Sequence, residues 1–218
     1  MTLHDTRIVI EDRDSYPGIV DVLGRETSVN RILTQPKSSF RLRDIMDHQK
    51  ILLVNLAKGV IGEDTASLLG SLLVARLGLA ALSRADVDEA ERRDFFIYLD
   101  EFHSFTTLSL TGMLAELRKF HAGLILSQQY LAQVDEQLRD AIFGNVGTII
   151  CFRVGAVDAE LLAREFYPYF SATDLTHLPN YHIYLKLMID GMPSSPFSAI
   201  TLRTLGANGS GERKAASG

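Results

Sequence analysis

Two adjacent acids, Asp100 and Glu101, follow directly after the apolar run at residues 95–99. A strand that is covered on both faces reads as such a run, and open α/β sheets bind their ligands where the strands end. Acids at that place suit a phosphate-handling site, in which one carboxylate orders the water around Mg²⁺ and the other polarises an attacking water. The same pair could instead cap the next helix, because acidic side chains favour helix N-termini.

Further polar side chains follow the next two predicted strands. The strand at residues 123–127 runs into Gln128 and Gln129, and the strand at residues 147–154 contains Arg153. In a parallel sheet these strands finish at the same edge as the strand at 95–99, so the two acids, residues 127–129 and Arg153 are expected to share one rim. A glutamine there could sense a γ-phosphate, and an arginine could neutralise charge in the transition state. Solvated strand ends are the competing interpretation.

Hydrophobic periodicity supplies the elements that position this rim. Apolar runs predict strands, and apolar residues at helical spacing predict helices. The expected elements are a strand at 51–57, a long helix from Asp64 or Thr65 to about 85, the three strands above, helices at 108–121, 130–142 and 156–166, and a closing hairpin with its turn at 190–195. Alternating strands and helices predict an α/β fold with a mostly parallel, helix-covered sheet and a C-terminal antiparallel hairpin.

Composition divides the chain into three parts. Residues 1–45 mix short apolar clusters with proline, glycine and charge, which predicts loops and short helices. Residues 46–205 carry the periodic elements and are expected to form the core. Residues 206–218, GANGSGERKAASG, are of low complexity and are expected to be a disordered tail.

The chain has 218 residues, 46% of them apolar, and a formal net charge of −5. This balance argues against a small stand-alone DNA-binding module, although a motor with a locally basic channel remains compatible with it. The single cysteine, Cys151, lies in the apolar run TIICFRV and can form no internal disulfide. We interpret it as a core residue of a protein in a reducing compartment.

One stretch raises the question of a membrane. Residues 66–83 are nearly all apolar and approach the length of a spanning helix, but Arg76 lies at their centre, where a charge is costly in lipid. We expect a helix buried against the sheet. The opening residues turn acidic before any long apolar run and predict no signal peptide, so a soluble cytoplasmic protein is expected.

The residues also resemble a known family. The string YLDEFHSF…LAELRKFHAGLILSQQYLAQ…LRDAIFGNVGTIICFRVG…DAELLAREF is similar to the C-terminal half of the ATPase domain in type IV secretion and conjugative coupling proteins of the TraD/TraG type, which belong to the HerA/FtsK superfamily of ring-forming, RecA-like DNA pumps. The similarity covers roughly residues 30–203. It implies a RecA-like P-loop NTPase core of three layers, of which this chain holds the distal, Walker B side.

The resemblance assigns roles to individual residues. Asp100 would be the Walker B acid that supports Mg²⁺ through water, and Glu101 the base that orients the attacking water. Gln129 would be the sensor glutamine and Arg118 the arginine that reaches a neighbouring subunit's site, with Arg153 as a second candidate for nucleotide contact in trans. The implied cofactors are ATP and Mg²⁺. The implied partners are DNA, further copies in a hexameric ring, and relaxosome or secretion-channel proteins, at the inner face of a bacterial membrane that only other segments would enter.

One part of the family pattern is missing from these 218 residues. P-loop ATPases grip the phosphates with the motif G-x-x-x-x-G-K-[ST], and no such motif is present. The nearest string, KGVIGEDT at residues 58–65, places Glu-Asp where Lys-Ser/Thr is needed, and its acids would repel phosphate. We therefore expect the chain to be inactive as an ATPase by itself.

Three functions follow as hypotheses. The first is the Walker B part of an ATP-driven DNA translocase of a conjugative or type IV secretion system. The second is a non-catalytic RecA-like scaffold that binds a partner ATPase or a DNA-processing protein. The third is a metal-dependent hydrolase that uses Asp100, Glu101, His103 and His121, although these residues show no metal-site spacing such as H-E-x-x-H.

Overall fold

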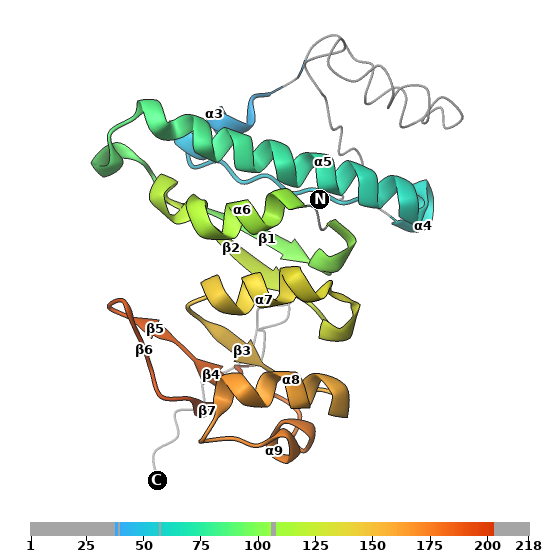
Figure 1. Cartoon of the computed structure of the whole chain (residues 1–218). Coiled ribbons are helices and arrows are strands. Elements are labelled where there is room, and N and C mark those ends of the chain that lie inside the picture. The colour runs from blue at the N-terminus through green and yellow to red at the C-terminus, as the bar shows by residue number, and fades with distance from the viewer. Residues whose placement is uncertain (1–37, 39, 57, 106–107, 203–218) are drawn as a thin grey trace, which may run out of the picture. The chain divides into compact units, whose positions relative to one another are not determined.

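The computed structural model describes residues 38, 40–56, 58–105 and 108–202 (Figure 1). Two compact units, residues 1–145 and 146–218, make up the chain, and each is described by itself. The predicted tail at 206–218 and most of the predicted N-terminal part, 1–37 and 39, lie outside the described residues. The helices and strands of the first unit are α3 (Leu42–Asp47), α4 (Lys58–Ile61), α5 (Glu63–Leu82), β1 (Phe95–Asp100), α6 (Leu108–Glu116), β2 (Ala122–Ser127) and α7 (Glu136–Asn145), with short 3₁₀ turns between several of them.

Strands β1 and β2 pair in parallel, as the sequence predicts, and their register runs from Phe95 opposite Ala122 to Asp100 opposite Ser127. Alternate β1 residues point to opposite faces. Ile97 and Leu99 are therefore buried, whereas the side chains on the other face, Phe96 and Tyr98, are 59% and 73% exposed. Both strands end at one edge and deliver their polar residues there.

The long helix α5 packs closely against neighbouring elements through two glycines. A Cβ atom at Gly70 would clash with the ring of Phe105, and one at Gly78 would lie 2.8 Å from the sulfur of Met113. The absent side chains let α5 approach the 3₁₀ turn after β1 and helix α6. By length and composition alone, residues 63–86 could also cross a membrane; core helices of soluble proteins meet the same criteria, so this test is weak.

Three expected elements differ from the structure. Residues 51–56 form no strand, although exposure alternates along them, with Ile51 at 87% and Leu53 at 67%. Helix α7 begins at Glu136 rather than at residue 130, because the Asp135 carboxylate accepts the backbone N–H groups of Gln137 and Leu138 and so caps the helix. The predicted helix at 108–121 ends as an α-helix at Glu116 and continues as a 3₁₀ turn.

The second unit contains β3 (Ile149–Cys151), α8 (Ala156–Phe166), α9 (Ala172–Thr176), β4 (His182–Lys186), β5 (Met188–Ile189), β6 (Met192–Pro193) and β7 (Phe197–Ile200). Tyr184 of β4 stacks on Phe170 with ring centroids 3.7 Å apart and also contacts Phe166 at the end of α8. Lys186 pairs with Glu165 of α8 at 3.0 Å. These contacts place α8 on one face of this unit's sheet.

The strand order of this unit corrects one expectation and confirms another. Strand β3 pairs antiparallel with β4, in a sheet of order β3-β4-β7, instead of extending a parallel sheet. The predicted C-terminal hairpin is present, because β4 and β7 pair antiparallel and β5 and β6 form a small hairpin beyond them. Its turn uses Asp190 and Gly191, both with positive φ, as tight two-residue hairpin turns require.

A buried arginine fastens the entrances of the two parallel strands. Arg84, 1% exposed, donates to the backbone oxygens of Arg93 at 2.6 Å and Phe120 at 2.8 Å. Each of these residues lies two positions before its strand, so the two carbonyls continue the β1–β2 register beyond the first pair. The Arg84 Nε atom also lies 3.1 Å from an oxygen of Asp47. One guanidinium therefore fixes both strand entrances to α3.

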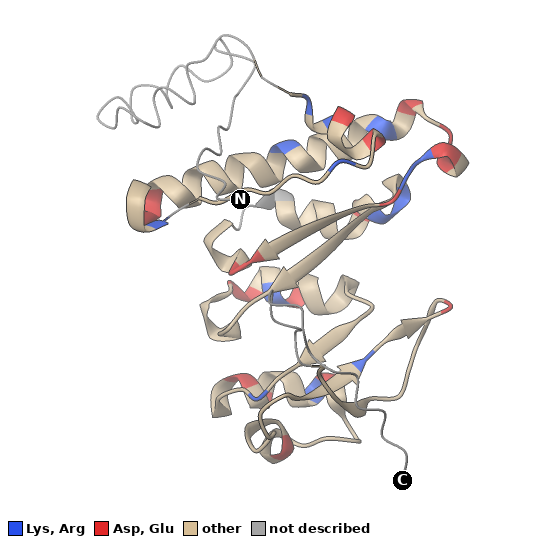
Figure 2. Ribbon diagram, turned by 180° about the vertical axis from the view of Figure 1, so that it is seen from behind, with Lys and Arg blue, Asp and Glu red and all other residues tan. Residues whose placement is uncertain are grey.

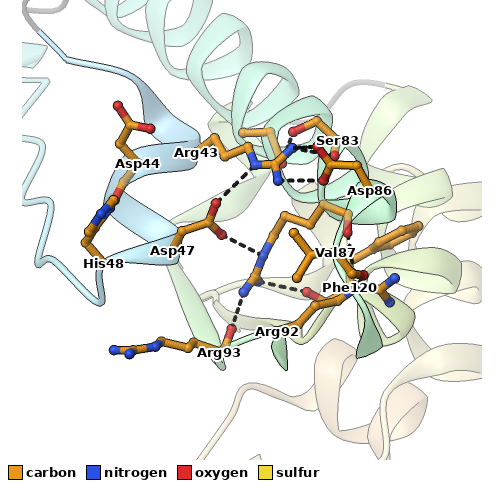
Figure 3. A network of polar contacts seen from close by, with 12 residues as sticks. Arg43, Asp44, Asp47, His48, Ser83, Asp86, Val87, Arg92, Arg93 and Phe120 are labelled. Carbon is orange, nitrogen blue, oxygen red and sulfur yellow. Dashed lines mark hydrogen bonds and ion pairs between the residues drawn. The ribbon is translucent and has the colours of Figure 1, made fainter. Parts of the chain in front are cut away.

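Neighbouring arginines extend this network (Figure 3). Arg43 donates to both oxygens of Asp86 and to the Ser83 carbonyl, and these hydrogen bonds lower the pKa of the Asp86 carboxyl. Arg92 donates to the Val87 carbonyl at 2.9 Å and to the Lys119 carbonyl at 2.6 Å. The second of these bonds makes another link between the segments that enter β1 and β2.

Replacing Arg84 by methionine is expected to lower the free energy of unfolding by about 3 kcal/mol, because two buried carbonyls and Asp47 lose their partner. Arg76→Met is the matched control, since Arg76 is an exposed arginine of α5. Urea unfolding followed by circular dichroism measures both variants. Equal stability of the two variants would contradict the strand-fastening role of Arg84.

Cys151 is buried, as the sequence predicts. Burial is the main cause that raises its pKa from 9.0 to about 12, and the negative charge of Asp158 is a smaller one. The folded chain therefore keeps the thiol proton at pH values where the unfolded chain loses it. Stability is expected to fall above pH 9 by up to about 1.4 kcal/mol per pH unit, and Cys151→Ala should remove this component of the pH dependence. Urea titrations of both proteins at pH 8 to 10.5 test this prediction. The same dependence of the unfolding free energy on pH in the wild-type chain and in Cys151→Ala would contradict it.

Candidate functional site

The carboxyl edge of the β1–β2 pair gathers the predicted acids with residues of the second strand. The hydroxyl of Ser127 donates a hydrogen bond to Oδ1 of Asp100, the residue directly opposite in the register. Asp100 is exposed. Figure 2 shows acidic residues at this end of β1. The parallel pairing alone is enough to produce this contact.

Glu101 points toward different partners because its backbone leaves the strand. Its φ angle is +49°, in the left-handed region that non-glycine residues rarely adopt. The carboxylate accepts a hydrogen bond from the side-chain amide of Gln128 at 3.2 Å and lies 3.6 Å from Nδ1 of His103. The two adjacent acids thus have separate environments, one exposed and one held by an amide.

Two further residues complete the cluster. Ser104 lies 3.4 Å from His103 through their Oγ and Nε2 atoms, and its hydroxyl accepts a hydrogen bond of 2.7 Å from the ammonium of Lys58. Lys58 is the first residue of α4, so a third segment of the chain reaches this edge. The cluster is defined here as Lys58, Asp100, Glu101, His103, Ser104, Ser127 and Gln128.

This arrangement suits water-mediated chemistry at a phosphate. Asp100 and Ser127 present hard oxygen atoms of the kind that Mg²⁺ prefers, usually with several waters retained. Glu101 is held in one orientation by a donor, as a water-orienting base must be. The residues present therefore fit a hydrated magnesium ion beside an oriented carboxylate.

A site in which the protein directly encloses a metal finds no support here. Within residues 38–202, apart from the undescribed positions, no group of three or more His, Cys, Asp or Glu side chains could hold a metal ion. His121, one of the residues of the metal-hydrolase hypothesis, lies just before β2 and pairs with Asp94 at 2.9 Å. That position is at the opposite end of the strand from Asp100.

The structure distinguishes the two glutamines. Gln128 contacts Glu101, whereas Gln129 is exposed in the bend that follows β2. The residue pattern identified the pair as the polar end of a strand, and the family resemblance assigned the sensor role to Gln129. The contact depends on the turn after Ser127, which decides which amide faces the first strand.

The two predicted arginines belong to elements other than those that form the cluster. Arg118 is exposed in the 3₁₀ turn before β2, at the end where the strands begin. The strand rises by about 3.3 Å per residue, so its length separates Arg118 from Ser127 by roughly 17 Å or more. Arg153 belongs to the second unit and donates to the side-chain oxygen of Asn180 at 3.1 Å.

The left-handed backbone conformation of Glu101 predicts how two substitutions at this position differ in stability. Glu101→Gly and Glu101→Ala both remove the hydrogen bond from Gln128, but only glycine adopts φ +49° without steric cost. The glycine variant is expected to be more stable than the alanine variant by about 1 kcal/mol. Paired urea titrations give the difference, and an alanine variant as stable as the glycine variant would show that the backbone relaxes.

Comparison with known proteins identifies a family. The model of the type IV secretion-system coupling protein DNA-binding domain matches residues 10–167, more than half of the chain. No curated protein matches it. Among solved structures, the chain is similar to the bacterial conjugative coupling protein TrwBΔN70, in a trigonal form in complex with sulphate. The identity is 14%, the TM-score is 0.54, and the match covers 72% of this chain and 43% of that one.

Two viral structures are also similar. The genome packaging NTPase B204 from Sulfolobus turreted icosahedral virus 2, in complex with AMPPCP, is 17% identical with a TM-score of 0.47, over 72% of this chain and 70% of that one. The DNA-packaging ATPase B204 from Sulfolobus turreted icosahedral virus is 16% identical with a TM-score of 0.45, over 72% and 71%. The match to the coupling protein supports the α/β fold, and this chain spans less than half of that protein's length.

Proposed function

Since the chain belongs to the family of type IV secretion-system coupling protein DNA-binding domains, we propose that it is the Walker B part of an ATP-driven DNA translocase in a conjugative or type IV secretion system. The observation that carries the proposal is the pairing of Asp100 with Ser127 and of Glu101 with Gln128 at one edge of two parallel strands. In RecA-like three-layer motors, such an edge faces the nucleotide phosphates.

The acids divide the work of hydrolysis. Asp100, exposed beside the Ser127 hydroxyl, would hold a hydrated Mg²⁺. The ion would neutralise charge on the ATP phosphates. Glu101 polarises the attacking water, and the amide of Gln128 holds its carboxylate in place. Gln128 therefore joins the expected Gln129 as a candidate sensor, and the hydrogen bond to Glu101 favours Gln128.

ATP hydrolysis also needs a phosphate-binding loop, which these residues do not provide. No G-x-x-x-x-G-K-[ST] motif occurs among the 218 residues, so the loop that holds the phosphates would come from other polypeptide. The same holds for a transition-state arginine. Arg118 lies at the far end of β2 from Asp100, so it can serve a neighbouring copy's site but not its own. This geometry favours a ring, for which the family suggests a hexamer.

The proposed setting follows from the family. DNA is the translocated partner, relaxosome or secretion-channel proteins deliver or receive it, and the described units face the bacterial cytoplasm at the inner membrane. Arg153 remains a second candidate for contact with nucleotide in trans.

A non-catalytic scaffold is the second candidate function. The missing phosphate loop and the acids of KGVIGEDT favour it, because both disfavour nucleotide binding by this chain alone. In that case the module would bind a partner ATPase or a DNA-processing protein, and Glu101 would serve no catalytic purpose.

Mg-ATP hydrolysis, with and without single-stranded and double-stranded DNA, tests the proposal. The chain alone is expected to show no turnover, and a complex with the polypeptide that supplies the phosphate loop should hydrolyse ATP. Glu101→Gln should lower turnover of the complex by at least about 100-fold, the usual contribution of a general base. Glu116→Gln, at an exposed acid of α6, is the matched control.

Two outcomes would contradict the proposal in different ways. Full activity of the complex carrying Glu101→Gln would favour the scaffold. Turnover by the chain alone that Glu101→Gln abolishes would show that these residues contain their own phosphate grip, against the expectation from the missing motif.

A further inference from the structure

A continuous line of polar contacts leads from Lys58 to Glu101. The Lys58 ammonium lies 2.7 Å from the Ser104 hydroxyl, which lies 3.4 Å from Nε2 of His103. Nδ1 of the same ring lies 3.0 Å from Oε1 of Gln128, whose Nε2 atom donates to Glu101 at 3.2 Å. All five side chains belong to the first unit. Glu101, His103 and Ser104 lie in the segment that follows β1, and Lys58 and Gln128 each contact a residue of that segment.

Hydrogen-bond chemistry permits the following order along this line. A lysine ammonium can only donate, so the Ser104 oxygen accepts from Lys58 and the serine hydrogen is left for Nε2 of His103. A ring whose Nε2 accepts carries its proton on Nδ1 when neutral. That proton is donated to Oε1 of Gln128. The amide then presents its N–H to Glu101.

One backbone contact supports the same order, and a second holds Ser104 in place. The backbone N–H of His103 donates to Oε1 of Gln128 at 3.2 Å, which places the amide oxygen on the histidine side. The Ser67 hydroxyl of α5 donates to the Ser104 backbone carbonyl at 2.5 Å. Gln128 Nε2 also donates to Oε1 of Gln133 at 3.3 Å.

We propose that Lys58 is a positioning residue for Glu101. Its ammonium orients the Ser104 hydroxyl, the hydroxyl selects the Nδ1–H tautomer of His103, and this tautomer holds the Gln128 amide with its N–H on the Glu101 carboxylate. The inference rests on the proposed function, because the orientation of Glu101 matters to hydrolysis only if this residue polarises water. It adds a residue from a third segment, 46 positions away from Ser104, to that site.

The opposite order of hydrogen bonds is a defined alternative. Nδ1 of His103 also lies 2.8 Å from Nε2 of Gln128, and in the Nε2–H tautomer it would accept from that amide. The N–H of Gln128 would then be divided between His103 and Glu101. Lys58 and the histidine would both donate to Ser104, and Lys58 would have no influence on the carboxylate.

The tautomer can be measured without any enzymatic activity. In the full chain labelled with ¹⁵N-histidine, long-range ¹H–¹⁵N correlation spectra at pH 8 distinguish Nδ1–H from Nε2–H, and the loss of one ring in His103→Asn assigns the signal. We expect the Nδ1–H pattern in the wild-type chain. Lys58→Met, which removes the ammonium but keeps an unbranched side chain, and Ser104→Ala should each convert it to a mixture or to Nε2–H.

Matched variants test the specificity of this change. Lys50→Met, at an exposed lysine outside the cluster, should leave the His103 signals unchanged, and Ser104→Thr should keep the Nδ1–H pattern because it retains the hydroxyl. An Nε2–H ring in the wild-type chain overturns the proposal without any variant. Unchanged His103 signals in Lys58→Met and Ser104→Ala overturn it as well.

Kinetics separate the inference from the proposed function. In the ATP-hydrolysing complex, Lys58→Met should lower kcat by about 10-fold with KM within twofold, since outer hydrogen-bond partners of functional groups typically contribute about 10- to 100-fold. If the wild-type complex hydrolyses ATP and the Lys58→Met complex has the same kcat, the positioning role is overturned. Absence of wild-type turnover in that complex counts against the proposed function, while the spectra still decide the order of the hydrogen bonds.

Discussion

The parallel register of β1 and β2 is the constraint on which the rest of the first unit depends. Arg84 secures it at the start, where one buried guanidinium binds the carbonyls of Arg93 and Phe120. Six ladder pairs later the same register places Asp100 opposite Ser127. A slip by one residue would turn every side chain to the other face, so the buried apolar residues and the polar edge would be lost together. The arginine network at one end and the candidate site at the other are therefore consequences of one alignment.

At the carboxyl edge, a single change of backbone conformation separates two neighbouring acids. Asp100 still follows the strand and meets the second strand directly. Glu101 turns into the left-handed region and meets Gln128 instead. Such a conformation costs about 1–3 kcal/mol and persists where surrounding contacts hold it. The gain is that adjacent residues of the same charge take different partners and can take different roles.

The sequence predicted those features that depend on local pattern. Apolar runs ending in polar residues located β1, β2 and their common edge, and helical spacing located α5 and α8 within a few residues. Features that depend on contacts between distant segments were beyond it. The apolar run at 51–56 has strand composition but forms no strand, and β3 pairs with β4, which lies more than 30 residues later. The choice of Gln128 and the arrival of Lys58 at Ser104 likewise depend on turns whose geometry the residue types do not specify.

The two ends of the strands also differ in what they can do. The carboxyl edge is supplied with internal hydrogen bonds from three segments, so the orientation of its acids needs no second molecule. Arg118 is held at the other edge, beyond the reach of those acids by the length of a strand. Within one copy, the acids and the exposed Arg118 therefore lie at opposite ends of the strand pair, and the proposed use of both at one site would require a second copy. If the proposed hydrolysis takes place, this separation makes it a property of the assembly, because each copy would contribute its acids to one site and its arginine to the next.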